Sequence, residues 1–547
     1  MRFPGRQSII LAAMDSEFDV AVLGGAFSGA ATALLIKRRR PEARILIIEK
    51  ATEFDRKVGE STTEVSSCFL TRILGLTSYL GHEQLVKQGL RLWFASRPDQ
   101  PFDDCVEIGA RYQARLPTFQ VDRAKLDGHL LELARQAGCE IWKPAKVTRC
   151  DLAAGAGGGD PGSDSISTAD ESRAHCPRLQ RLAVNVDGAE RQVRARWVVD
   201  ATGRASFLAR KLGQFRQNTE HPINAVWARF SGVKDWDSYE WRERFPDYAA
   251  AARTGRSWAT NHLMGQGWWC WIIPLKGGDY SAGVVYDSRL FSLPDGPDLG
   301  TRLHQHILTH PVGREIFRAA KVIEHDTRAY SNLPYHAAEV CGDGWAIAGD
   351  AASFIDPLYS PGLDLCAYTT SVVSDLVVRS LGGEDTGERR RYYNEQFVTT
   401  YRNWFETLYK DKYFYMGEAD LMSAALLLDV GSYFVGLVRP IYANPERSFL
   451  QLPFEGLPGR IVAAIMKFYN RRLSALARNR IAHGMAGARN SGWRELYDGF
   501  VPDIRLQKLM RKGLFRWWKA ELLNLRFLFL PRRQRVALPA PAAAEVS

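Results

Sequence analysis

Paired cysteines and long uncharged runs are both scarce in this 547-residue chain. The eight cysteines are scattered and none forms a Cys-x-x-Cys pair, so we expect reduced thiols, with neither a zinc site nor a disulfide framework. The apolar run at residues 9–13 is too short for a secretory signal. We therefore expect a cytoplasmic protein in which either Met14 is the true start or residues 1–17 form a loose tail.

Several chemical signatures are also missing. The sequence contains no Gly-x-Ser-x-Gly elbow and no Gly-Lys-Ser/Thr phosphate loop, which leaves serine hydrolases and P-loop enzymes without support. His304, His306 and His310 are close in sequence, but their spacing does not gather them on one helical face, so we predict no metal site. The longest apolar region, residues 421–438, includes Asp429 and Gly431 and is interpreted as a buried helix pair instead of a membrane span.

The positive charge is concentrated at one end of the chain. Residues 439–547 hold 20 Lys/Arg against 7 Asp/Glu, whereas the whole chain carries only +11, so the remainder is slightly acidic. Such an excess of positive charge could bind a membrane surface, an acidic partner or nucleic acid. Residues 504–530 in particular could form a basic amphipathic helix for a membrane or an acidic carrier protein. We prefer a helix packed on the protein body with a solvated basic face, and we expect no nucleic-acid partner.

The order of apolar segments predicts an α/β protein. A strand at residues 20–23, a helix at 28–40 and a second strand at 45–48 form a βαβ opening, and a further helix is predicted at 122–137. Residues 153–178 are rich in Gly, Ser and Asp and are expected to be a flexible insertion. We predict a Rossmann-type domain at 18–215 and 330–380, an antiparallel β substrate domain at 216–329, and a C-terminal helical region at 381–547.

A glycine-rich turn joins the first strand to the first helix, with the sequence Gly24-Gly25-Ala26-Phe27-Ser28-Gly29. It matches the G-x-G-x-x-G pattern of dinucleotide-binding turns except at Ala26, whose methyl group is tolerable if the backbone angles suit it. Glu49 follows 20 residues after Gly29, where an acid is needed to accept hydrogen bonds from a ribose. These features predict a dinucleotide site with its pyrophosphate at the helix N-terminus, and an ordinary βα turn is the alternative.

Two later segments favour FAD over NAD. Residues 199–204 close a strand with a small-residue turn, and residues 344–352 read as a buried strand followed by Gly349-Asp350 and small residues that open a helix. This second segment resembles the second flavin fingerprint of the aromatic hydroxylase-type flavoproteins. The resemblance implies that Asp350 binds the ribityl chain and that Arg123 contacts the flavin. The alternative for Asp350 is a helix N-cap, which is compatible with the same placement.

Three motifs resemble those of the flavin-dependent halogenases. Residues 269–274 fit W-x-W-x-I-P through Trp269 and Trp271, residues 354–362 carry the Phe, Pro, Ser and Gly of the second signature, and residues 58–62 resemble the V-G-E-[AS]-T loop with Glu60. The resemblance implies that the tryptophans wall the flavin side of the site and that Ser360 and Gly362 lie at the halide. For the tryptophans, the alternative is an aromatic strand in a core.

The resemblance also implies a reaction and its partners. Reduced FAD from a separate flavin reductase and O₂ would oxidise chloride or bromide to hypohalous acid. A tunnel would lead this oxidant to Lys87, which matches the family's catalytic lysine, and there it would halogenate an electron-rich aromatic ring. The alternative for Lys87 is an ordinary surface lysine.

Two residues depart from the family pattern. Tyr359 replaces the Glu of tryptophan-specific members, which favours a phenolic, pyrrolic or carrier-bound aromatic substrate over free tryptophan. Pro361 has no backbone N–H where the family uses one to hold halide, which leaves the N–H of Gly362. A non-halogenating FAD-dependent monooxygenase or oxidoreductase on the same scaffold is therefore the alternative function, and a non-catalytic surface-binding protein is a third hypothesis.

Overall fold

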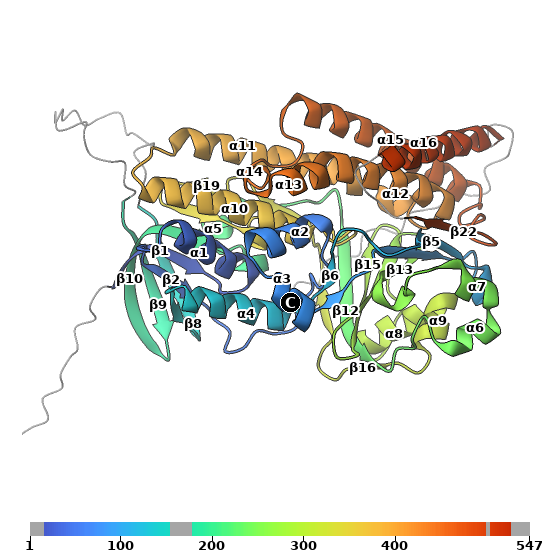
Figure 1. Ribbon diagram of the computed structural model, residues 1–547, viewed down its shortest axis with the longest axis horizontal. Helices are drawn as coiled ribbons and strands as arrows, with labels where there is room; N and C mark the ends of the chain where they lie inside the picture. The colour runs from blue at the N-terminus through green and yellow to red at the C-terminus, as the bar shows by residue number, and fades with distance from the viewer. Residues whose placement is uncertain (1–15, 154–177, 499–503, 527–547) are drawn as a thin grey trace, which may run out of the picture.

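Two sheets lie beside each other, and C-terminal helices extend across both of them in the computed structural model (Figure 1). The structure describes residues 16–153, 178–498 and 504–526. Most of the predicted N-terminal tail and the predicted insertion at 153–178 therefore lie outside the described residues. The first strand already begins at Ser16, two residues inside the predicted tail.

The first sheet is the Rossmann-type sheet that the βαβ pattern predicts. Its strand order is β19-β20-β10-β1-β2-β7, in which β20, β10, β1, β2 and β7 run parallel and β9 and β8 extend from β10. The strands β1 and β2 are apolar and almost wholly buried, as expected for parallel strands covered on both faces. The bounds are β1 (Ser16–Leu23), β2 (Ile45–Ile48), β7 (Glu140–Trp142), β8 (Ala145–Asp151), β9 (Gln180–Val186), β10 (Ala189–Asp200), β19 (Cys341–Gly342) and β20 (Trp345–Ile347).

Helices α1 (Phe27–Arg39), α4 (Arg123–Gln136) and α10 (Gly362–Leu381) pack around this sheet. Helix α4 begins where the sequence predicts, because the Asp122 carboxylate accepts a hydrogen bond from the Ala124 N–H at 3.0 Å and caps the helix. Short elements connect the layers: α2 (Glu64–Cys68), α3 (Thr77–Glu83), α5 (Phe207–Lys211), β3 (Leu85–Val86), β6 (Phe119–Gln120), β11 (Phe215–Gln217), β18 (Tyr335–Ala337) and β21 (Ser353–Phe354).

The second sheet contains strands from three separate parts of the chain, and the predicted range 216–329 supplies one end of it, from β16 to β13. Its order is β16-β12-β15-β14-β13-β4-β5-β22, with β17 also on β12. Most pairs are antiparallel, but β13–β4 and β5–β22 are parallel, because β4 and β22 enter from distant segments. The strands are β4 (Leu90–Phe94), β5 (Val106–Ala110), β12 (Ile223–Ser231), β13 (Thr260–Gly265), β14 (Trp268–Pro274), β15 (Tyr280–Asp287), β16 (Lys321–Val322), β17 (Arg328–Tyr330) and β22 (Arg494–Tyr497). The helices on this side of the molecule are α6 (Tyr239–Arg244), α7 (Pro246–Ala251), α8 (Leu299–Thr309) and α9 (Pro311–Phe317).

Helices dominate the described part of the chain after residue 361, as predicted. They are α11 (Gly387–Trp404), α12 (Ala419–Tyr433), α13 (Arg439–Ala443), α14 (Pro445–Ser448), α15 (Gly456–Ala482) and α16 (Ile504–Asn524). The predicted helix pair at 421–438 is wrong, because one continuous helical stretch runs through Ala419–Ala443. Gly431 does not interrupt it, since its bare backbone leaves room for the Met510 side chain of α16. This stretch is long and apolar enough to cross a membrane, but 67% of its apolar window is buried in the protein.

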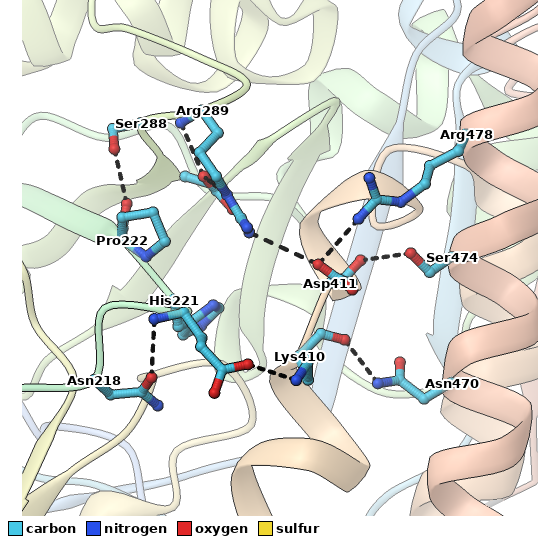
Figure 2. Close-up of polar contacts among 12 residues, drawn as sticks. Asn218, His221, Pro222, Ser288, Arg289, Lys410, Asp411, Asn470, Ser474 and Arg478 are labelled. Carbon is cyan, nitrogen blue, oxygen red and sulfur yellow. Dashed lines mark hydrogen bonds and ion pairs between the residues drawn. The ribbon is translucent and has the colours of Figure 1, made fainter. Parts of the chain in front are cut away.

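A polar junction fastens helix α15 to the loops of the second sheet (Figure 2). The Asp411 carboxylate forms ion pairs with Arg478 of α15 at 3.1 Å and with Arg289 after β15 at 3.9 Å. The Asn470 side chain of α15 donates to the Lys410 carbonyl at 2.8 Å. The C-terminal helices are thus held against the loops that border the second sheet.

The turn between β1 and α1 requires glycine at position 29, because a Cβ there would lie 1.8 Å from the Gly24 carbonyl oxygen. We predict that Gly29→Ala lowers the unfolding free energy by roughly 1–3 kcal/mol, as overpacking does in other tightly packed sites. Thermal unfolding followed by circular dichroism measures the loss. The matched control is Gly436→Ala, where a Cβ would meet open space inside a helical segment and should be neutral or slightly stabilising. Equal melting temperatures for the two variants would contradict this account of the turn.

Candidate active site

The glycine-rich turn and the acid after β2 are joined directly. The Glu49 carboxylate accepts hydrogen bonds from the backbone N–H of Gly25 at 2.7 Å and of Ala51 at 2.8 Å. Ala26 lies at the N-cap of α1 with a φ of −75°, an angle that any L-residue adopts, so its methyl group causes no backbone strain. The structure therefore brings the predicted acid to the predicted turn.

The Gly-Asp fingerprint has a different local structure from the predicted one. Gly349 and Asp350 form a 3₁₀ turn (η5, Gly349–Ala351) followed by β21, and the long helix α10 begins only at Gly362. The expectation that small residues after Asp350 open a helix, with Asp350 as its cap, is wrong. Close packing explains the turn, because Gly349 has a φ of +64° and a Cβ there would lie 2.0 Å from the Ser28 hydroxyl of α1.

A cavity lies between the two sheets, and we call it the tryptophan cavity. Trp269 and Trp271 of β14 form one wall, and Asp350, Ser360 and Gly362 lie in the opposite segments. Glu60 and Arg123 also line it. The structure thus collects seven of the predicted site residues here, whereas the glycine turn and Glu49 lie outside the lining.

Arg123 and Glu60, which line the tryptophan cavity, each form a salt bridge. Arg123 forms a salt bridge with Asp127 at 3.2 Å, and burial raises the pKa of Asp350 although the nearby Arg123 guanidinium lowers it. Glu60 accepts from Arg229 of β12 at 2.8 Å, and Arg229 also reaches Asp122 at 3.2 Å. The sequence analysis missed Arg229, because its strand shows only an apolar pattern and its partners lie more than a hundred residues away.

The segment between Phe354 and Gly362 separates this cavity from a second one. Its residues Tyr359 and Ser360 both adopt left-handed backbone conformations, with φ of 68° and 59°, which non-glycine residues rarely adopt. Pro361 follows as the N-cap of α10 and lines both cavities. We call this segment the dividing loop.

The second cavity contains Lys87 and is called the lysine cavity. The Lys87 side chain is only 6% exposed, and its ammonium group donates to the Thr62 carbonyl at 2.8 Å. The alternative of a surface lysine is therefore excluded. Burial lowers the pKa of Lys87 to about 8, while the charges of Glu64 and Asp364 partly oppose the shift.

Two carboxyl groups that the sequence analysis missed share the lysine cavity with Lys87. Asp364 is in the first turn of α10 and accepts from the Thr63 hydroxyl at 2.5 Å and the Ser66 N–H at 3.1 Å. Glu64 lies at the start of α2. Only the three-dimensional fold brings α2, α10 and the Lys87 loop together. Their proximity was therefore not visible in the sequence.

The far wall of the lysine cavity comes from the C-terminal helices. Asp429 of α12 accepts from Lys412 at 2.7 Å and from the Tyr469 hydroxyl at 2.6 Å, and the Tyr359 hydroxyl lies 3.3 Å from it. Trp404, Leu426 and Tyr433 complete this wall. Within the described ranges, no group of three or more His, Cys, Asp or Glu side chains could hold a metal ion.

The two cavities and the loop between them can be compared with known proteins. No family model matches the chain. A flavin-dependent halogenase, chlA, from Dictyostelium discoideum is 24% identical over 78% of this chain and 71% of its own length. A tetracycline 7-halogenase from Kitasatospora aureofaciens is 22% identical over 78% of this chain and 76% of its own length. The solved structure of halogenase PltM covers 92% of this chain and 98% of its own with a TM-score of 0.67 at 15% identity.

The chain resembles the flavin-dependent halogenases. The resemblance predicted from the three motifs is confirmed, and so is the Rossmann-type fold. A 1H-pyrrole-2-carbonyl-[peptidyl-carrier protein] chlorinase from Pseudomonas fluorescens is also similar, with 22% identity over 72% of this chain and 84% of its own length.

The acidic groups beside Lys87 lie outside the three predicted motifs. Tyr359, the residue predicted to disfavour free tryptophan as substrate, has its hydroxyl 3.3 Å from Asp429. The carboxyl groups that influence the Lys87 charge are instead Glu64 and Asp364. The acidic character of the lysine cavity is thus supplied by other elements of the fold.

Asp364 should make the stability of the protein depend on pH. Burial raises its pKa from 3.8 to about 7, against the hydrogen bonds from Thr63 and Ser66 that lower it. Because the folded state favours the neutral form of Asp364, protonation of this group stabilises the fold. This contribution is complete below pH 3.8 and is lost as the pH rises through about 7. We predict that Asp364→Asn, which keeps the acceptor oxygen but cannot ionise, raises the melting temperature by several degrees at about pH 8 and changes it little at about pH 4.

Scanning calorimetry of both proteins at the two pH values measures this difference. The exposed substitution Asp295→Asn, in a loop before α8, is the control and should show no such pH-dependent gain. A stabilisation by Asp364→Asn that is the same at both pH values would show that ionisation of this group is not involved.

Proposed function

We propose that this chain is an FAD-dependent halogenase that uses reduced FAD, O₂ and chloride or bromide to halogenate an electron-rich aromatic substrate. The observation that carries the proposal is the meeting of two cavities at Pro361, one with the tryptophan pair and the other with the buried Lys87. The similarity to curated halogenases over most of the chain supports halogenation over the non-halogenating alternative.

The residues present fit FAD. Glu49 and the first turn of α1 would hold the adenosine and pyrophosphate parts, and Asp350, Arg123 and Glu60 would meet the polar parts of the flavin half. The tryptophan cavity has space for a flat ring beside Gly362, where an added Cβ would meet no atom within 4 Å. Bound reduced FAD would supply two of the four electrons that reduce O₂ and the halide would supply the other two, so that hypohalous acid and water are formed.

The first turn of α10 is suited to hold the halide in the tryptophan cavity. The first N–H groups of a helix have no intrahelical acceptor and favour anions, and Gly362, the first residue of α10, lines the cavity. Pro361 contributes none. The loss of one such hydrogen bond to an anion costs about 1.5–3 kcal/mol, so halide should bind one to two decades more weakly than with a full donor pair.

Lys87 would receive the oxidant on the other side of the dividing loop. Because its pKa is about 8, the ammonium form predominates at neutral pH and can donate a hydrogen bond to hypohalous acid. The aromatic carbon then bonds to the halogen, the ring proton is lost, and the hypohalous oxygen leaves as water. Glu64 or Asp364 can accept the proton.

The lining of the lysine cavity favours a phenolic substrate. Glu64 and Asp364 have oxygens that can accept a hydrogen bond from a phenol. Arg115 at the exposed edge of the cavity could meet the anionic part of a carrier-bound aromatic, a substrate type that the carrier-protein chlorinase and brominase relatives support. We further propose a cytoplasmic location and a separate flavin reductase as the source of electrons.

The function is tested by incubating the full chain with FAD, a flavin reductase, NADH, bromide and an electron-rich phenol, and analysing the products by mass spectrometry. We expect a brominated phenol. Lys87→Met should lower this activity roughly a hundredfold or more while flavin binding persists, because it removes only the group that carries the oxidant. Lys276→Met, at an exposed turn, is the matched control and should retain full activity. Oxygenated product without brominated product would contradict the proposal.

The halide site has its own test. Pro361→Ser restores a backbone N–H at the start of α10, so we predict that it lowers the bromide concentration needed for half-maximal rate by about one decade. Steady-state rates over a bromide series measure the change, with the phenol concentration held saturating. An unchanged bromide dependence, in a variant that still binds flavin, would show that the proline does not limit the halide site.

A further inference from the structure

Helices α15 and α16 carry an unusual concentration of positive charge. Helix α15 contains six Lys/Arg and no Asp/Glu, and α16 contains six Lys/Arg and the single acid Glu521. Arg472 of α15 forms a salt bridge with that acid, with its guanidinium 2.7 Å from the Glu521 carboxylate. Acids of other elements pair with Lys467, Arg478, Arg480, Lys512 and Arg516. The basic side chains of the pair that remain exposed outside these ion pairs are Arg460 and Arg471 of α15 and Lys508, Arg511 and Lys519 of α16.

The same two helices expose large apolar side chains. On α15, Leu457, Ile461, Ile465 and Phe468 follow one another at helical spacing and are each 52–69% exposed. Such a spacing places them along one side of the helix. Exposed apolar stripes of this length are unusual in soluble proteins unless they meet a partner or a membrane.

A matching stripe lies on α16. Leu514, Phe515, Trp518, Leu522 and Leu525 are each 45–59% exposed and again share one side of the helical segment. Trp517 of α16 packs against Phe468 of α15 with ring centroids 5.7 Å apart, which makes the two stripes neighbours. We call the combined surface the α15–α16 face.

Packing against the protein body does not account for these side chains. The body side of α16 is formed by Leu506 and Ala520, which are buried, and by Gly513, which lies against Leu427 of α12. The predicted packing of this helix on the body is therefore correct. The exposed stripe is a second apolar side, separate from the one that the core uses.

We propose that the α15–α16 face docks on an anionic lipid surface. An amphipathic helix that lies in a membrane interface combines Trp, Phe and Leu on one side with Lys and Arg beside them. Here Lys508, Arg511 and Lys519 are exposed on α16 next to Phe515 and Trp518. Basic groups near an anionic leaflet gain attraction that adds to the burial of apolar side chains.

The docking face is separated from the lysine cavity by one helix. Leu426, Asp429 and Val430 of α12 line that cavity, and the neighbouring Leu427 and Gly431 contact α16. Docking would therefore hold the cavity within about the diameter of one helix, ~10 Å, of the helix that meets the lipid. The docking itself does not depend on the reaction proposed above, so it can be tested without turnover.

The experiment is flotation of the full chain with vesicles of phosphatidylcholine and phosphatidylserine, compared with vesicles of phosphatidylcholine alone. We expect flotation with the anionic vesicles and release as salt is raised. Phe515→Gln with Trp518→Gln should abolish flotation, and Lys508→Glu with Lys519→Glu should weaken it by about tenfold or more. All four side chains are exposed, so the variants should fold like the parent.

The control for charge is Arg242→Glu with Lys276→Glu, which makes the same change of net charge on exposed side chains of the second-sheet region and should leave flotation unchanged. Light scattering after size-exclusion chromatography is measured in parallel. Absence of flotation with anionic vesicles at low salt overturns the proposal. So does a parent oligomer that Phe515→Gln with Trp518→Gln converts to monomer, because a second copy of the chain would then cover the face.

Discussion

The dividing loop is the constraint on which the rest of the active site depends. It separates the two cavities, yet it contains two residues in left-handed conformations that are costly for non-glycine side chains. Buried hydrogen bonds hold it in place. Asp356 accepts from the Leu358 N–H at 2.8 Å and from the Tyr413 hydroxyl at 3.0 Å, and lies 2.8 Å from His221. Tyr409 adds a hydrogen bond to the Leu358 carbonyl at 2.9 Å.

These supports connect the loop to both parts of the molecule. The Tyr413 hydroxyl also accepts from the Trp269 indole at 3.0 Å, so a wall of the tryptophan cavity and the dividing loop share one buried network. Tyr409 and Tyr413 lie on either side of Lys410 and Asp411, which form the polar junction with α15. The C-terminal helices are thus part of the site, because without them the loop would lose its partners and the lysine cavity its far wall.

The sequence predicted those parts of the active site that depend on local patterns. The first βαβ unit and the position of Glu49 follow from short apolar strands and a glycine turn, and the tryptophan pair and Lys87 follow from motifs. Contacts between segments that are distant in the sequence could not be predicted. Arg229, Glu64, Asp364 and Asp429 form no motif with their partners, because their chemistry depends on neighbours that only the folded chain provides. The helix expected after Asp350 failed for a related reason, since close packing of Gly349 on Ser28 decides that turn.

The two buried lysines near the lysine cavity show how such neighbours decide the chemistry. Lys412 and Lys87 are both removed from water, which lowers the pKa of an ammonium group. At Lys412 burial lowers the pKa most, but the Asp429 carboxylate at 2.7 Å and Tyr359 together outweigh it, so the pKa is raised and this lysine stays charged. At Lys87 the ammonium donates to a neutral carbonyl, and burial prevails. The same type of side chain is therefore a structural cation at Lys412, whereas at Lys87 its pKa lies close to neutral pH.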